Sequence, residues 1–261
     1  MSDDGVSETA ATATDATADD DRPRVAVFRP ADERLDRAVE LLDSLGVRPV
    51  GDPMLAVAPT GVAPREDADY AILTSKTGVE LVAEAGWRFD GTLCAIGEST
   101  ASALRDAGYA VDVVPEVFSS AGLVETLADR VSGTRVEVAR SDHGSAVLTD
   151  GLNDAGAFVH ETVLYRLTRP PDSGESVALA ARGDLDAALF TSSLTVEHFL
   201  DAAAERGIHE DALAGLDAAV VGTIGDPTRT VAEAAGIDVD VVPETADFET
   251  MARAVVATLT G

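Results

Sequence analysis

Short, almost uninterrupted apolar runs alternate along the chain with longer segments in which apolar residues recur every three or four positions. The short runs predict β-strands, and the longer segments predict amphipathic helices. The predicted strands are RVAVF (24–28), YAILT (70–74), LCAI (93–96), VDVV (111–114), RVEVA (135–139), FVHETVLY (158–165), AALF (187–190), AVVG (219–222) and VDVV (239–242). The predicted helices lie near 35–45, 77–85, 99–107, 121–131, 145–155, 194–205, 227–235 and 247–259. Apolar strands alternating with amphipathic helices indicate parallel sheets covered on both faces, so the predicted fold class is α/β.

One long pattern occurs twice. The segment DYAILTSKTGVELV (69–82) matches DAALFTSSLTVEHFL (186–200) at a spacing of 117 positions. The segment AIGESTASALRDAGYAVDVVPE (95–116) matches TIGDPTRTVAEAAGIDVDVVPE (223–244) at a spacing of 128 positions. Two matches of this length indicate an internal duplication and two related domains. A cleft between two such domains is a common place for a ligand.

Proline-containing segments predict where the chain passes between these domains. Prolines interrupt both helices and strand ladders, and they stand in Gly51-Asp52-Pro53 and in Thr168-Arg169-Pro170-Pro171. We therefore expect residues 54–165 to form a domain inserted between the two pieces of the other, 22–52 and 168–261, with a double linker. Residues 1–21 carry seven acids before the first base and no large apolar cluster, which predicts a disordered acidic tail.

Charge narrows the class of protein. The formal net charge is −28, yet 46% of the 261 residues are hydrophobic, so the chain is a folded acidic protein. Its basic residues are 18 arginines and one lysine, which resembles proteins from a salt-saturated cytoplasm; an ordinary acidic protein is the alternative. No basic stripe exists to bind nucleic acid. Without a long apolar window or a signal-like N-terminus, we expect no membrane segment and a cytoplasmic location.

Cysteine and histidine spacing argues against bound cofactors. Cys94 is the one cysteine and stands in an apolar run, which indicates buried packing. The four histidines have no ligand spacing, and no phosphate-binding glycine loop opens a helix after a first strand. We expect neither a metal nor any cofactor.

Hydroxyl-bearing residues and glycines follow four predicted strands directly. In open parallel sheets, ligands bind beyond the carboxyl ends of the strands, where helix N-termini present free N–H groups to anions. The candidate binding residues at these turns are Thr74, Ser75, Gly97, Ser99, Thr100, Thr191, Ser192, Ser193, Gly225 and Thr228. The alternative is that each serine or threonine simply caps its helix. Lys76 follows Thr74-Ser75 at a helix start and is a candidate cation, although a surface lysine is an equal alternative.

The order of these motifs resembles the uroporphyrinogen-III synthase family over residues 22–261. Further matching elements are Phe28-Arg29-Pro30, Val138-Ala139-Arg140-Ser141 and Val163-Leu164-Tyr165. The resemblance implies two flavodoxin-like parallel-sheet domains that arose by duplication and are joined by a two-stranded linker. It also implies a monomer that needs no cofactor and acts on hydroxymethylbilane, a linear tetrapyrrole with eight carboxylates. Transient contact with the preceding, bilane-forming enzyme is a further expectation.

By this resemblance, Tyr165 is the candidate catalytic residue. It would help the terminal hydroxymethyl group leave as hydrogen-bond donor or general acid, and a tyrosine that only packs is the alternative. An azafulvene and a spiro intermediate would follow, ring D would invert, and water would be released. Arg29, Arg140 and Ser141 are candidate substrate-binding residues, and each arginine is equally suited to a surface ion pair.

Two readings from other classes stay open. The chain could be a two-lobed α/β protein that binds a small ligand without turnover, or a regulatory tandem module. Against the second, the strands end in Thr-Ser rather than in a paired-aspartate phosphoacceptor pocket. Product analysis separates an enzyme from a binder, because a binder leaves the bilane to cyclise spontaneously to isomer I.

Overall fold

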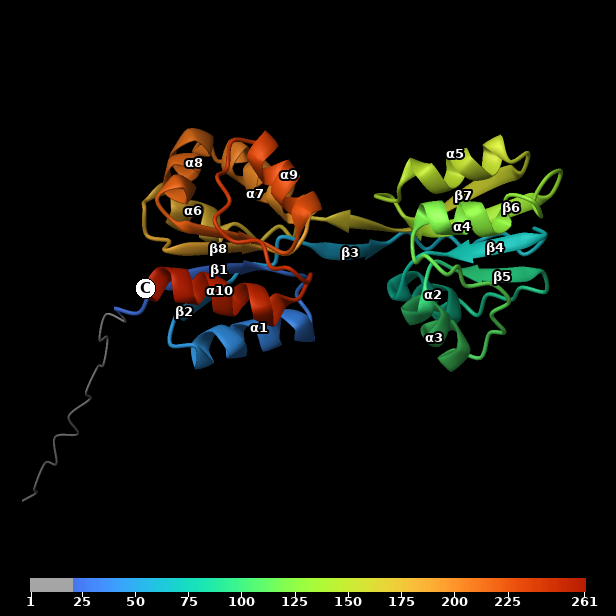
Figure 1. Ribbon diagram of the computed structural model, residues 1–261, viewed down its shortest axis with the longest axis horizontal. Helices are drawn as coiled ribbons and strands as arrows, with labels where there is room; N and C mark the ends of the chain where they lie inside the picture. The colour runs from blue at the N-terminus through green and yellow to red at the C-terminus, as the bar shows by residue number, and fades with distance from the viewer. Residues whose placement is uncertain (1–20) are drawn as a thin grey trace, which may run out of the picture.

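Two lobes, each built around one sheet, lie side by side along the long axis of the molecule (Figure 1). This computed structural model describes residues 21–261. The expected acidic tail, 1–21, therefore lies outside the described residues apart from Asp21.

Lobe 1 combines both ends of the described chain. Its parallel four-stranded sheet has the order β2-β1-β8-β9. Its elements are β1 (Arg24–Phe28), α1 (Glu33–Ser44), β2 (Arg48–Gly51), α6 (Glu175–Ala181), β8 (Ala187–Phe190), α7 (Ser193–Glu205), α8 (His209–Asp217), β9 (Val220–Thr223), α9 (Asp226–Ala234) and α10 (Phe248–Thr260).

The central strands of lobe 1 are apolar throughout because both of their faces are covered. In β1, Val25 and Val27 pack under α1 and α10, whereas Ala26 and Phe28 pack on the opposite face with α6 to α9 (Figure 1). The Phe28 ring stacks on Phe190 of β8 with centroids 4.6 Å apart. Burial on two faces is why this strand reads as an uninterrupted run rather than an alternating one.

Lobe 2 is built from the middle of the chain. Its five-stranded sheet has the order β3-β7-β6-β4-β5, and all neighbours are parallel except β3 and β7. Helices α2 and α3 cover one face, and α4 and α5 cover the other (Figure 1). Its elements are β3 (Ala56–Pro59), β4 (Tyr70–Leu73), α2 (Lys76–Glu84), β5 (Thr92–Ala95), α3 (Glu98–Asp106), α4 (Ser120–Leu127), β6 (Arg135–Ser141), α5 (Ala146–Asp154) and β7 (Phe158–Thr168).

Strand β7 serves two partners in succession. It pairs with β6 from Phe158 to Tyr165, and then antiparallel with β3 from Tyr165 to Thr168. Figure 1 shows β3 and this end of β7 between the two lobes. Tyr165 is therefore inside a strand rather than at its end, at the residue where one pairing passes into the other.

A buried carboxylate ties together the two places where the chain leaves and re-enters lobe 1. Asp52 follows β2 and is 1% exposed. It accepts hydrogen bonds from the backbone N–H groups of Gly174 (2.8 Å) and Ser176 (3.0 Å) at the start of α6, and from the Ser176 hydroxyl. Sequence analysis interpreted Asp52 only as part of a proline-marked boundary.

The sequence prediction of strands at 111–114 and 239–242 is wrong. Each segment makes only a one-residue bridge, Cys94 with Val113 and Gly222 with Val241. An aspartate side chain takes the place of a backbone partner in both, because Asp112 accepts from the Leu93 N–H and Asp240 from the Val221 N–H, each at 2.8 Å. Elements β2, β3, α6 and α8 were not predicted, since their apolar residues are few or their segments short.

No helix in the described part of the chain is long and apolar enough to cross a membrane.

Candidate functional site between the lobes

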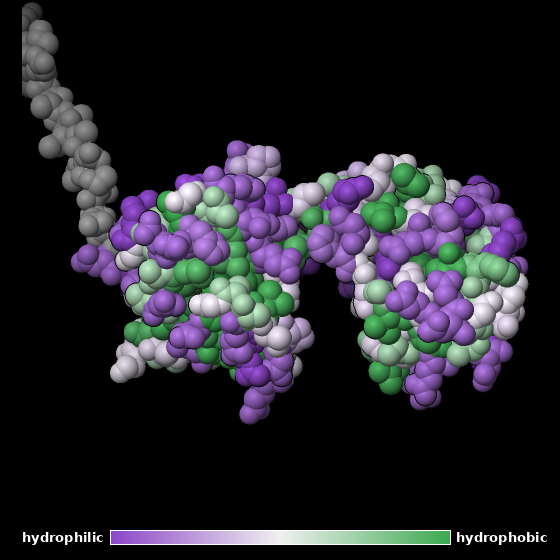
Figure 2. Space-filling model, turned by 90° about the horizontal axis from the view of Figure 1, so that it is seen from above, coloured by the Kyte–Doolittle hydropathy of each residue, from purple (hydrophilic) through white to green (hydrophobic). Residues whose placement is uncertain are grey.

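The carboxyl ends of both sheets face each other. The arrowheads of β1 and β8 point toward lobe 2, and those of β4 and β5 point toward lobe 1 (Figure 1). The turns that carry the predicted binding residues follow these strand ends, so the two lobes present them toward one another. Figure 2 shows the molecule narrowed between the lobes, with both facing surfaces accessible.

A cavity of about 750 Å³ lies at this junction, bounded by the start of α1, by the length of α2 and by β3. Its floor includes Val57 of β3. The residues that line it are Asp32, Glu33, Arg34 and Arg37 from lobe 1, and Lys76, Thr77, Glu80, Leu81 and Glu84 from lobe 2. Lys76 is the one predicted site residue in this lining. Arg34 and Arg37 were missed, although their place in the first helix after the first strand was a usable signal.

The cations of the cavity differ in their partners. Arg34 forms an ion pair with Asp32 (2.5 Å), and this hydrogen bond holds the pKa of the Asp32 carboxyl below its usual value. Asp32 also caps α1 by accepting from the Arg34 N–H at 2.9 Å. Arg37 and Lys76 have no ion pair and no side-chain hydrogen bond among the described residues. One unpaired cation thus faces the cavity from each lobe.

Tyr165 and Ser75 meet beside this cavity. The Tyr165 hydroxyl donates to Ser75 Oγ at 3.0 Å, and the phenol is 6% exposed. Ser75 Oγ also accepts from the Gly78 N–H at 3.0 Å as the N-cap of α2. The Ser75 hydroxyl therefore remains available to donate a hydrogen bond to a further acceptor. Thr74 is half-buried at the end of β4, and Lys76 is exposed as the first residue of α2.

The two predicted arginines are held by protein groups. Arg29 is half-buried in lobe 1, with its guanidinium 4.5 Å from the Phe248 ring centroid and donating to the Arg34 carbonyl at 3.3 Å. Burial, and then the nearby Arg34 charge, lower the pKa of Arg29. Arg140 is buried and bonds to Glu161 (2.8 Å) and to the Ser145 carbonyl (2.6 Å). Ser141 follows it at a shift in the β6–β7 register.

In lobe 1, the hydroxyl cluster after β8 makes local hydrogen bonds. Thr191 donates to the Phe28 carbonyl (2.5 Å), and Ser193 donates to the Pro227 carbonyl (3.2 Å). Ser192 caps α7 in a capping box with Thr195. The capping alternative therefore describes Ser75 and Ser192 correctly as far as these contacts go.

In the two Ile-Gly segments the caps are the glycines, Gly97 for α3 and Gly225 for α9. Thr100 and Thr228 are buried in the first turns of these helices, and Ser99 is exposed. A side chain at Gly97 would place its Cβ 3.1 Å from Cβ and Cγ of Phe118. The space beside Gly97 is thus filled by Phe118, whereas the nearest atom at Gly225 is 3.9 Å away.

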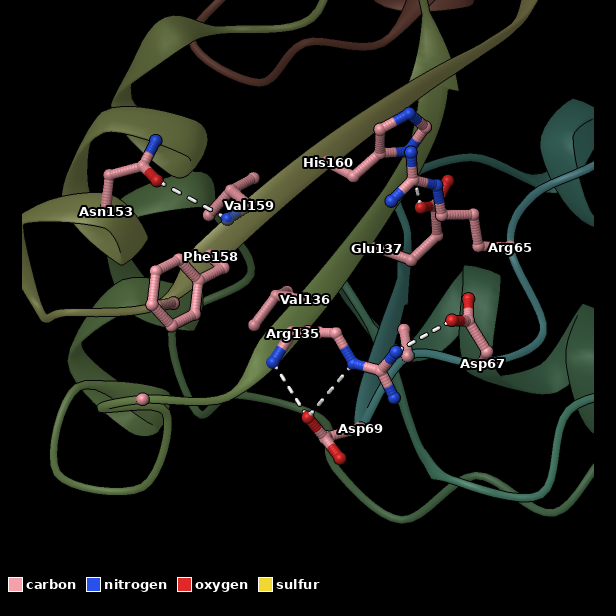
Figure 3. Close-up of a pocket in the computed structure, with 13 residues that line it drawn as sticks. Arg65, Asp67, Asp69, Arg135, Val136, Glu137, Asn153, Phe158, Val159 and His160 are labelled. Atoms are coloured by element: carbon pink, nitrogen blue, oxygen red, sulfur yellow. Dashed lines mark hydrogen bonds and ion pairs between the residues drawn. The ribbon is translucent and has the colours of Figure 1, made fainter.

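A second cavity, of about 690 Å³, lies at the opposite end of lobe 2, where β6 and β7 begin (Figure 3). Arg135 pairs there with Asp67 at 2.7 Å, and its backbone N–H donates to Asp69 at 2.8 Å. His160 contacts the buried Glu137 at 2.7 Å. None of the predicted site residues lines this cavity, and it lies at the amino ends of the strands. Among the described residues, no group of histidine, cysteine and carboxylate side chains could hold a metal ion.

Comparisons with known proteins point to one family. The family model described as uroporphyrinogen-III synthase HemD matches residues 36–253. A Methanothermobacter thermautotrophicus protein named "Putative uroporphyrinogen-III synthase" is 32% identical, over 84% of this chain and 92% of its own length. The uroporphyrinogen-III synthase of Synechococcus elongatus is 30% identical, over 64% of this chain and 66% of its own. A crystal structure of a mutant uroporphyrinogen III synthase from Thermus thermophilus is similar in fold, with a TM-score of 0.62 at 20% identity over 91% of this chain and 99% of its own.

Proposed function

The chain belongs to the uroporphyrinogen-III synthase family, and we propose that it closes hydroxymethylbilane to uroporphyrinogen III with inversion of ring D and loss of water. One observation carries the proposal to this molecule: the cavity between the lobes has an unpaired cation on each side, Arg37 and Lys76. A linear substrate with carboxylates along its length can reach both, so the two lobes would hold its two halves together for ring closure.

Binding a polyanion by a chain of net charge −28 requires local compensation. Lys76 and Arg37 supply point charges, and Arg29 supplies a third near the edge of lobe 1. The turns with Thr74, Gly97 and Gly225 supply backbone N–H groups at helix N-termini. The further hydroxyl-bearing and arginine candidates in this binding set are Ser75, Ser99, Thr100, Arg140, Ser141, Thr191, Ser192, Ser193 and Thr228.

Tyr165 and Ser75 are the pair we assign to departure of the substrate hydroxyl. The phenol donates to Ser75 Oγ, and Ser75 retains one proton of its own. Ser75 can therefore donate to the leaving hydroxyl while Tyr165 supports the developing charge on the serine oxygen. The assignment rests on the orientation of this hydrogen-bond chain, which the Ser75 cap contact with the Gly78 N–H fixes. The carbon–oxygen bond breaks as the hydroxyl takes the Ser75 proton and leaves as water. The pyrrole nitrogen supplies the electron pair and gives up its N–H proton, which restores the proton lost from the Tyr165–Ser75 pair and leaves the azafulvene.

We also propose that the two lobes arose by duplication and are joined by the β3–β7 pair as a linker. Support comes from position: the one-residue bridges Cys94–Val113 and Gly222–Val241 are 128 residues apart at both ends. The caps Ser75 and Ser192 are 117 residues apart. With these bridges counted, lobe 1 reads β2-β1-β8-β9-Val241 and lobe 2 reads β7-β6-β4-β5-Val113, the same spatial order with a different chain start.

The reaction as proposed is a cofactor-independent cyclising dehydration in the cytoplasm. The test is to incubate freshly generated bilane with purified, chelator-treated protein and to separate the product isomers. The proposal expects isomer III with full activity after chelation. A two-lobed binder without turnover would leave isomer I, and activity restored only by an added metal or nucleotide would contradict cofactor independence.

A further inference from the structure

Two large apolar side chains of lobe 2 are exposed to solvent. Val117 is 61% exposed and Phe118 is 63% exposed, in the segment between α3 and α4. Scattered exposed apolar residues are ordinary, so these two adjacent ones, which include an aromatic ring, are a candidate binding surface only if their position supports it.

The position of Phe118 is set by the sheet. Val113 bridges Cys94 of β5 in parallel, so the chain beyond it runs to the carboxyl edge, the edge that faces lobe 1. There Phe118 lies against Gly97, the cap of α3, and directly precedes Ser119, the cap of α4. Figure 2 shows hydrophobic side chains on the side of lobe 2 that is turned toward lobe 1.

The contact with Gly97 explains a glycine that its backbone conformation does not require. Gly97 has φ −174°, an extended value that any residue adopts. A Cβ there would instead press on Phe118 at 3.1 Å. The glycine thus lets the Phe118 side chain settle against the helix start, with the remainder of the ring surface open.

Lobe 1 lacks the equivalent surface. The positions 128 residues after Val117 and Phe118 are Thr245 and Ala246, directly before Asp247, the cap of α10. An aromatic ring at this turn is therefore a property of one lobe only. It would distinguish the two ends of a substrate whose repeating units are otherwise alike.

We propose that Phe118, with Val117 beside it, packs against a pyrrole ring of the linear tetrapyrrole. This rests on the proposed function and adds an apolar binding residue to it. Aromatic pairs favour offset-stacked or edge-to-face contacts with centroids about 4.5–7 Å apart. The first turns of α3 and α4 begin beside Phe118, and their helix dipoles favour the negative charge that the ring's carboxylates would bring. Phe118 thereby positions one end of the substrate in lobe 2.

The experiment compares Phe118→Ala with Phe158→Ala. Phe158 is a phenylalanine of the same lobe with 68% exposure, but it stands at the opposite end of the sheet. We expect Phe118→Ala to raise KM roughly 2- to 13-fold, because an aromatic contact contributes about 0.5–1.5 kcal/mol beyond the area it buries. Phe118→Tyr, which keeps the ring, should stay within about twofold of the natural protein, and Phe158→Ala should leave KM unchanged.

Melting temperatures accompany the kinetics, and both alanine variants should melt near the natural protein because the side chains are exposed. Equal KM values for Phe118→Ala and the natural protein would overturn the inference while leaving the proposed function intact. If the natural protein itself formed no isomer III, the proposed function would fail instead. Should Phe118→Ala unfold, Phe118→Leu decides the question, since it keeps apolar area and loses the aromatic contact.

Discussion

The Tyr165 hydroxyl donates to Ser75 Oγ across 3.0 Å and so joins the strand that leaves lobe 2 to the first turn of α2. The same serine oxygen accepts from Gly78, which fixes it in place as a helix cap. The phenol is therefore oriented by a group that is itself held by backbone. Lys76, the next residue, lines the cavity between the lobes.

Removing the phenol oxygen should reduce turnover while the fold persists. We expect Tyr165→Phe to lower kcat by about 10- to 1000-fold, because Ser75 loses the hydrogen bond that supports its proton donation; general-acid assistance contributes typically 10²–10⁴, and the bilane is itself reactive. The lost hydrogen bond should cost about 1 kcal/mol of unfolding free energy. Steady-state kinetics beside urea unfolding measures both quantities.

Ser75→Ala separates capping from chemistry. It should lose about 1 kcal/mol of stability as any N-cap would, and also lose turnover comparably to Tyr165→Phe. Ser145→Ala is the matched control, since Ser145 caps α5 and has no phenol partner. If Ser75→Ala and Ser145→Ala had the same kcat, or Tyr165→Phe kept the natural kcat, the pair would have only a packing role.

The buried Asp52 should hold the junction of the lobes. Asp52→Ala leaves the N–H groups of Gly174 and Ser176 without their acceptor, so we expect a loss of about 2–4 kcal/mol in unfolding free energy. Asp67→Ala, which breaks the exposed pair with Arg135, should cost less than about 1 kcal/mol. Equal losses in urea titrations would show that Asp52 is not a structural tie.

The fold class followed from the sequence because strands such as β1 and β8 are buried on both faces and read as unbroken apolar runs. The strand prediction for the segments at 111–114 and 239–242 failed because it relied on the same kind of apolar pattern. Their apolar pattern is strand-like, but pairing is limited to a one-residue bridge, and the Asp112 and Asp240 side chains accept the next N–H along the strand, that of Leu93 and Val221. Nothing in a local pattern distinguishes these two cases.

The site was predictable only in part. Turns after parallel strands could be located, and Lys76, predicted as a binding residue, lies in the cavity lining. The place of Arg37 in the first helix after the first strand was a usable signal, but its lack of an ion-pair partner depends on tertiary packing around the cavity, which the sequence does not show. The exposure of Phe118 could not be predicted from the sequence for a similar reason, since it depends on how the turn that carries the residue packs.

The thiol of Cys94 should be inert in the folded protein. Burial raises its pKa to about 12, so the thiol stays neutral and inaccessible at ordinary pH. We expect no iodoacetamide labelling at pH 8.5 in buffer and complete labelling in guanidinium, read by mass spectrometry. Rapid labelling of the native protein would show that β5 opens readily.

The same shift predicts how stability depends on alkaline pH. Because the folded pKa lies above the unfolded value of about 8.5, the unfolded state loses its proton first, and stability falls as pH rises from about 9 toward 12. The thiol contributes at most about 1.4 kcal/mol per pH unit. Cys94→Ala should flatten this slope; an unchanged slope would assign it to other groups, including Tyr109, whose pKa burial also raises.

We propose that the protein is halophilic, and we therefore expect its folding stability to depend on salt concentration. With 47 acids against 19 bases, self-repulsion opposes the compact state, and the Debye length shortens from about 30 Å at 0.01 M to about 3 Å at 1 M salt. The melting temperature should rise steeply between low and molar KCl. A flat profile would mean that the acidic composition is not an adaptation to salt.

The central claim is that the cavity between the lobes holds the bilane through cations from both sides, and the KM of the Arg37→Ala/Lys76→Ala double variant tests it most directly. We predict a rise of roughly 10- to 100-fold over the natural protein, as expected for the loss of two charge-assisted contacts, with the melting temperature unchanged. Arg88→Ala, which removes an exposed arginine just beyond the far end of α2, should keep the natural KM. A double variant with the natural KM would contradict the account and place the substrate elsewhere.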